Sequence, residues 1–193
     1  TMNDGATAPN WETAGGGGAW DLIASQDISD TDASVVFTSS HITTSYDVFL
    51  FIFLNVVCNT DDNHIKYQFS SDGGSSFLTG SDYHNRGNSA DDFGYIAQGT
   101  GASANEQYYG ELWLYDPTAT TYTHARVDGV NRNYNGYVYH ATGSSYGDGQ
   151  ATVVHESATA INGIKFYPSS DGAGGAAAGF DRGTIRLYGL KNS

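Results

Sequence analysis

The segment Val48-Phe49-Leu50-Phe51-Ile52-Phe53-Leu54 decides the fold class of this chain. It belongs to a longer apolar run, Tyr46 to Val57, in which aromatic and aliphatic side chains alternate. Successive side chains of a strand point to opposite faces, so the phenylalanines share one face and the aliphatic residues share the other. A strand that is apolar on both faces must be covered twice. We therefore expect one face in a core and the other against a further layer or a neighbouring subunit.

Shorter β-like runs recur on both sides of this segment, and clusters of Gly, Asn, Asp or Ser close each of them. No amphipathic run with the helical period accompanies them. The pattern predicts an all-β fold, a jelly-roll-like antiparallel β-sandwich of about eleven strands. The polar segment Gly80 to Ser89 is expected to form a long loop, and Asp116-Pro117-Thr118 is expected to form a turn. The predicted strands are Trp20 to Ser25, Ala33 to Thr38, Tyr46 to Val57, His64 to Ser70, Phe93 to Gln98, Tyr108 to Tyr115, Thr121 to Val127, Gly136 to Ala141, Ala151 to Glu156, Ile161 to Tyr167 and Thr184 to Leu190.

The first nineteen residues have the composition of a connector. Asp4-Gly5 favours a tight turn, Pro9 removes an amide donor, and the run Gly15 to Gly18 disfavours both helix and strand. We interpret residues 1–19 as a linker, of the kind expected where a domain has been cut from something longer. Residues 20–193 are expected to form a single β-sandwich domain, because all-β domains of about 200 residues are common.

Charge and hydropathy narrow the choice of partners. The chain has 8 basic and 21 acidic residues, a formal net charge of −13. Nucleic acids and anionic membranes attract basic surfaces, so we expect neither as a partner. The longest apolar run is much shorter than the 18 or more residues of a membrane span, and no secretory signal follows Met2. Cys58 is the only cysteine, which excludes an intramolecular disulfide and predicts a buried, inert thiol.

Motifs for catalysis are missing from the sequence. The six histidines are scattered without an HExxH pair, and no GxSxG elbow, P-loop or dinucleotide fingerprint occurs. We therefore expect no enzymatic activity and no organic cofactor. The segments Asp61-Asp62-Asn63 and Asp91-Asp92 could supply oxygen ligands for calcium, although the spacing of an EF-hand loop is absent and a solvated turn is the alternative.

Two polar, aromatic segments have the chemistry of a sugar site. A sugar site requires a ring face for the C–H patch of a pyranose together with amides and charges for its hydroxyls. The alternative for Tyr137 and Tyr139 is packing within the sheet, so we favour residues in the flanking loops. The candidate ligand-binding residues are Arg132, Asn133, Tyr134, Tyr146 and Asp148 in the first segment and Tyr83, His84 and Arg86 in the second.

The run Met2 to Trp11, followed by glycines, resembles the junction that precedes the terminal domain of bacteriophage tail fibres. Segments such as Trp20-Asp21-Leu22-Ile23, Gln68 to Phe77 and Gly183 to Gly189 resemble the terminal, receptor-binding β-sandwich of those virion proteins. The resemblance implies a homotrimer at the distal tip of the virion tail, extracellular after release. It also implies a host-surface glycan or outer-membrane protein as the partner.

A trimer would cover the second apolar face of Tyr46 to Val57, and we assign Phe49, Phe51 and Phe53 to the subunit interface. Two other functions stay open. The same sandwich could be a structural capsid decoration or cement protein without a receptor role, or the carbohydrate-binding appendage of a secreted enzyme. The linker-like start favours the fibre, because a free decoration protein does not need one.

Overall fold

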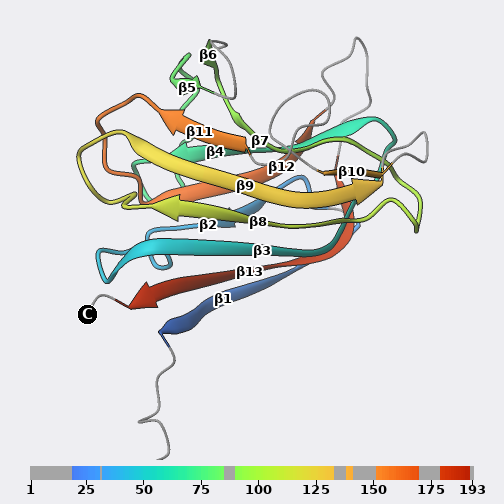
Figure 1. Cartoon of the computed structure of the whole chain (residues 1–193), viewed down its shortest axis with the longest axis horizontal. Coiled ribbons are helices and arrows are strands. Elements are labelled where there is room, and N and C mark those ends of the chain that lie inside the picture. Colours follow the sequence, from blue (N-terminus) through green and yellow to red (C-terminus); the bar gives the residue numbers. More distant parts are fainter. Residues whose placement is uncertain are drawn as a thin grey trace, which may run out of the picture.

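The computed structural model describes residues 19–30, 32–84, 90–132, 138–140, 151–169 and 179–191. These residues form thirteen β-strands in two antiparallel sheets and contain no helix, hence none that could cross a membrane (Figure 1). The predicted all-β sandwich is confirmed. Eleven strands correspond to the predicted runs. The other two, β5 (Tyr83–His84) and β6 (Ala90–Asp91), are two residues long, and β5 lies in the segment predicted as a loop.

The two sheets differ in width. The large sheet has nine strands, and the small sheet has four. In spatial order the large sheet contains β1 (Trp20–Ile28), β13 (Phe180–Lys191), β3 (Tyr46–Cys58), β8 (Tyr108–Tyr115), β9 (Thr123–Arg132), β11 (Ala151–His155), β5 and β6, with β10 (Val138–His140) also paired to β9. The small sheet contains β2 (Val35–Phe37), β12 (Gly163–Ser169), β4 (Asn63–Ser70) and β7 (Gly94–Thr100).

The connectivity is that of a jelly roll. Strand β1 pairs with β13, β2 with β12, β3 with β8, and β4 with β7. These four pairs are successive parts of one long antiparallel ribbon, and they alternate between the large and the small sheet as the ribbon folds over itself. Strands β9, β10 and β11 extend the large sheet beyond β8. In the β8–β9 hairpin, β8 therefore belongs to the ribbon and β9 begins the extension.

The phenylalanines of β3 lie at the centre of the core between the sheets. Phe49, Phe51 and Phe53 have no exposed surface. The rings of Phe51 and Phe53 meet Phe166 of the small sheet edge to face, with centroids 5.2 and 5.0 Å apart. The assignment of these three side chains to a subunit interface is therefore wrong. The small sheet supplies their cover, and each buried ring contributes about 2–3 kcal/mol of transfer free energy.

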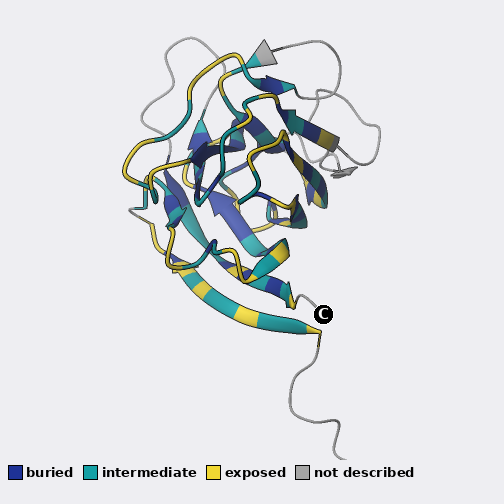
Figure 2. Ribbon diagram, turned by 90° about the vertical axis from the view of Figure 1, so that its left-hand side faces the viewer, coloured by how far each residue is buried: buried dark blue, intermediate teal, exposed yellow. Residues whose placement is uncertain are grey.

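The opposite, outward face of β3 is only half-buried. Val48, Leu50, Ile52 and Leu54 point away from the small sheet, and Figure 2 shows buried residues gathered inside the sandwich. Leu50 lies directly between Tyr188 of β13 and Trp113 of β8 in the sheet register. Large neighbouring side chains thus cover part of this face from within the same sheet.

Candidate functional site

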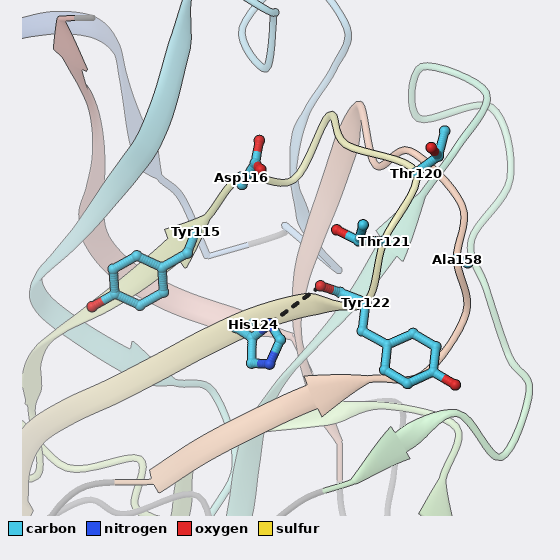
Figure 3. Close-up of a pocket in the computed structure, with 7 residues that line it drawn as sticks. All are labelled: Tyr115, Asp116, Thr120, Thr121, Tyr122, His124 and Ala158. Atoms are coloured by element: carbon cyan, nitrogen blue, oxygen red, sulfur yellow. Dashed lines mark hydrogen bonds between the residues drawn. The ribbon is translucent and has the colours of Figure 1, made fainter.

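A shallow groove of about 760 Å³ lies where β8 turns into β9 (Figure 3). Six of its lining residues come from this hairpin, and one comes from the segment after β11. The groove is open to solvent. Its lining residues are Tyr115, Asp116, Thr120, Thr121, Tyr122, His124 and Ala158.

The turn that forms the groove is anchored at both of its sides. Asp116 adopts a left-handed conformation with φ of 45°, which aspartate tolerates better than most residues. Its backbone N–H donates to the carbonyl of Asp47 at 2.6 Å, and the carbonyl of the buried Pro117 accepts from the N–H of Ile161 at 2.6 Å. The turn predicted at Asp116-Pro117-Thr118 is confirmed. These contacts fix the groove to β3 and to the segment before β12.

Two exposed tyrosines are the main feature of the groove. Tyr115 is 37% exposed and Tyr122 is 50% exposed. Their rings lie on either side of His124, whose Nδ1 is 3.1 Å from the carbonyl oxygen of Tyr122 (Figure 3). Tyr115 is directly opposite His124 in the register, so both side chains stand on the outward face of the large sheet. Two ring faces beside a carboxylate and threonine hydroxyls provide the groups that a sugar ring requires.

A charged network stands next to the groove on the same outward face. Glu111 Oε1 accepts from Trp113 Nε1 at 2.7 Å and from Arg126 Nη2 at 3.2 Å. The Arg126 guanidinium lies 5.8 Å from the centre of the Trp113 ring and 3.8 Å from the carboxylate of Asp128. The Trp113 and Tyr115 rings are nearly parallel, with centroids 6.5 Å apart. The network therefore fixes the orientation of an aromatic side chain beside Tyr115.

Tyr83 is a core residue, and its assignment to a binding site is wrong. Its side chain is fully buried. The phenol oxygen accepts from the N–H of Phe69 at 2.7 Å and donates to the carbonyl of Leu78 at 3.3 Å, and its ring stacks on Phe69. Burial raises the pKa of this phenol. Both hydrogen-bonding functions of the hydroxyl are used inside the protein, so no ligand can reach it.

The other predicted binding residues are not brought together by the described structure. His84 is half-buried, and its Nε2 lies 3.3 Å from the carboxylate of Glu156. Arg132 is exposed at the far end of β9, on the outward face that also carries His124. The remaining candidates lie outside the described residues: Arg86, Asn133, Tyr134, Tyr146 and Asp148.

The calcium candidates take part in local contacts. Asp61 Oδ1 accepts from the N–H of Ala102 at 2.8 Å, and Asp62 adopts a left-handed conformation. Among the described residues no group of three or more His, Cys, Asp or Glu side chains is placed to hold a metal ion. Cys58 is buried beside Thr100, and burial raises the pKa of its thiol to about 11. The thiol is therefore protonated, in agreement with the inert cysteine predicted from the sequence.

Sequence reasoning identified the turn and both strands of the hairpin, yet it missed the groove. The sequence feature that could have indicated the groove is the position of Tyr115 and Tyr122 on either side of an Asp-Pro turn. Only the register shows that Tyr115 and His124 share the outward face, and Tyr122 lies beside His124 in the groove. Comparison of the chain with family models, with curated proteins and with solved structures found no match.

Proposed function

We propose that this chain is a receptor-binding domain at the tip of a phage tail fibre and that it binds a host-surface glycan without catalysing a reaction. The groove between Tyr115 and Tyr122 is the observation that carries this proposal. The tyrosine rings offer apolar faces to the C–H patch of a sugar. Asp116 can accept from sugar hydroxyls, and the threonine hydroxyls can both donate and accept. The resemblance of the N-terminal run to a fibre junction supports the location.

The open shape of the groove fits a glycan on a cell surface. An open groove buries little of its ligand, so a single site would bind weakly. Surface glycans are repetitive, and several linked copies of a weak site can bind them together with much higher avidity. A fibre tip with three chains would supply that arrangement.

The homotrimer is part of this proposal, with a different contact face from the one expected from the sequence. Leu22 of β1 is 57% exposed and lies in one row with Tyr188 and Leu50 on the outward face of the large sheet. Packing this β1–β13–β3 half against neighbouring chains would cover the apolar face that the small sheet leaves open. The β8–β9 half would stay available for ligand.

A substitution at Tyr122 tests the glycan site. Tyr122→Ala is expected to weaken adsorption to host cells about tenfold per site, because one stacking contact contributes about 1–1.5 kcal/mol. Tyr122→Phe retains the ring and is the matched control, expected to bind nearly as the natural protein does. Adsorption is measured with fluorescent protein on host cells, before and after periodate oxidation of surface sugars. Unchanged adsorption of Tyr122→Ala would contradict the proposed site, and adsorption that survives periodate would indicate a protein receptor.

A structural role as a capsid decoration or cement protein is the second candidate. The exposed apolar side chain of Leu22 and its half-buried neighbours on the outward face favour it, because such a face could clamp adjacent virion proteins. The two candidate functions predict different results in binding experiments. A cement protein would bind purified capsids and stabilise them against heat, and it would not adsorb to host cells.

A further inference from the structure

Exposed apolar side chains are concentrated on the outward face of the β8–β9 hairpin. The described residues include five large apolar side chains that are more than a third exposed, and four of these belong to the hairpin. The fifth is Leu22 of β1. The four on the hairpin are Tyr109 at 44%, Tyr115 at 37%, Tyr122 at 50% and Val130 at 40%.

The register arranges these side chains in a continuous strip. Along β8 the outward positions are Tyr109, Glu111, Trp113 and Tyr115, and they face Val130, Asp128, Arg126 and His124 of β9 in that order. From Tyr109 to Tyr115 the strip is about 20 Å long at the usual rise per residue, and Tyr122 extends it beyond the strand end. We name these nine residues the outer hairpin strip. The groove is one end of the strip.

The middle of the strip is rigid before any ligand arrives. Trp113 is held by the Glu111 carboxylate at 2.7 Å and is contacted edge to face by Trp20 of β1, with centroids 5.6 Å apart. Arg126 is fixed by the same carboxylate. Side chains on paired strands lose little entropy on binding, so a platform of this kind gains affinity from its preorganisation.

The alternation of side-chain types favours a glycan over a protein partner for this strip. The centre of a protein–protein interface is usually depleted in Glu and Asp. Here Glu111 and Asp128 lie opposite each other in the centre, between Tyr109 on one side and the tyrosines of the groove on the other. Rings at intervals along a line, separated by groups that can bond hydroxyls, match successive sugar units of one chain.

Charge narrows the class of sugar. Arg126 is already paired with Glu111 at 3.2 Å and with Asp128 at 3.8 Å, and Asp116 adds another carboxylate at the groove. The whole chain has a net charge of −13. A polyanionic glycan would be repelled from such a surface.

We propose that the outer hairpin strip binds a linear chain of several neutral sugar units, with one end of the chain in the groove beside Tyr122. This inference rests on the proposed glycan-binding function and extends it from a single sugar position to a path along the hairpin. It predicts that affinity depends on the length of the chain. It also predicts that Tyr109, which lies outside the groove, takes part in binding long chains only.

The test measures how the binding of oligosaccharides depends on their length. The full chain and its variants are applied to an array of neutral and acidic oligosaccharides of one to eight units. For the natural protein we expect binding to rise with the length of neutral chains and to be weaker for acidic chains of equal length. Tyr109→Ala is expected to weaken binding of the longest neutral chains about tenfold, the effect of one stacking contact, and to leave the shortest bound chains unaffected.

Two further variants complete the design. Tyr122→Ala is expected to weaken binding of chains of every length, because it removes a ring of the groove. Thr79→Ala removes an exposed side chain on a loop outside both the hairpin and the β1–β13–β3 face, and is expected to bind as the natural protein does. Circular dichroism of each variant confirms that it is folded.

The outcomes separate this inference from the proposed function. Binding that is equal for short and long chains, or unaffected by Tyr109→Ala, would overturn the path along the hairpin and leave the glycan site standing. Preference for acidic chains would overturn the neutral class. Absence of binding to every oligosaccharide on the array would overturn the proposed glycan-binding function and the path with it.

Discussion

His155 is a buried histidine whose ring nitrogens have no hydrogen-bond partner among the described residues. It lies in β11 with its ring against Tyr83 and Phe69, at centroid distances of 4.7 and 5.5 Å. Burial lowers the pKa of this imidazole, and the carboxylate of Asp82 opposes the effect only in part. An aromatic cluster cannot solvate an imidazolium, so the folded protein holds His155 in its neutral form.

This burial makes stability depend on pH. The folded state binds a proton on His155 less readily than the unfolded state does, so acid favours unfolding. The contribution of the neutral His155 side chain to the free energy of unfolding is fully present above the ordinary histidine pKa of 6.5. This contribution is lost progressively as the pH falls below that value. We expect His155→Phe, which keeps an aromatic ring in the cluster, to lose less free energy of unfolding between pH 8 and pH 5 than the natural protein.

Urea unfolding of both proteins at the two pH values measures this difference. Carboxylates titrate alike in the two proteins, so the difference between their pH dependences isolates the histidine. An equal change in the free energy of unfolding for the two proteins would show that His155 does not contribute to the pH dependence of stability.

At the scale of the element, strand β3 is bent by a bulge in its second half. The pairing of β3 with β8 shifts between Phe53 and Val56, and Asn55 in this interval has a φ of 55°. Gly183 of β13 lies against the same point, where an added Cβ would meet the Cα of Val56 at 2.7 Å. A bulge increases the local twist of a strand, which lets a long strand such as β3 follow the curvature of the sandwich.

Substitutions at Asn55 test the role of the bulge. Asparagine tolerates the left-handed conformation, glycine adopts it without strain, and a β-branched residue does not. We expect Asn55→Gly to be near neutral and Asn55→Val to lower the free energy of unfolding by about 1–3 kcal/mol. Thermal or urea unfolding monitored by tryptophan fluorescence provides the measurement. Equal stability of the two variants would mean that β3 can be paired without the bulge.

At the scale of the whole molecule, the outward face of the large sheet has a mainly apolar half, which also carries Arg186, and a half that is rich in aromatic and charged residues. The β1–β13–β3 half carries Leu22, Leu50 and Tyr188, whereas the β8–β9 half carries the outer hairpin strip. A chain with a net charge of −13 repels its own copies, so association requires a face on which burial of apolar surface exceeds that repulsion. The β1–β13–β3 half has this character.

A charge at Leu22 tests the proposed trimer. The natural protein is expected to have three times the 20.5 kDa mass of one chain at micromolar concentration, and Leu22→Asp is expected to have the mass of one chain. Placing a carboxylate in an apolar contact costs several kcal/mol per subunit, whereas Leu22 is exposed enough in one chain to leave its fold intact. Light scattering after size exclusion gives the mass. Thr79→Asp adds the same charge on an exposed loop and is the control for the charge itself. A mass of 20.5 kDa for the natural protein would contradict the trimer.

The aromatic positions show how far sequence reasoning extends. Alternation along Tyr46 to Val57 predicted which side chains of β3 share a face, and this is confirmed. It could not predict which face is the core, because both faces are apolar and only the position of the small sheet distinguishes them. The burial of Tyr83 is not predictable from the sequence for a similar reason. A tyrosine in a polar segment has the composition of a loop residue, whereas its burial results from contacts with Phe69 and His155, which are distant in the sequence.

Local patterns in the sequence are sufficient to predict the fold class, the position of eleven strands and the Asp-Pro turn between β8 and β9, because strand periodicity and turn chemistry are local properties. Tertiary structure decided the pairing of β1 with β13 and of β3 with β8, which joins residues far apart in the chain. It also decided that Tyr109, Tyr115 and Tyr122 line one outward strip while Phe49, Phe51 and Phe53 are buried. Register and sheet packing set the environment of a side chain, and both depend on contacts that no local pattern contains.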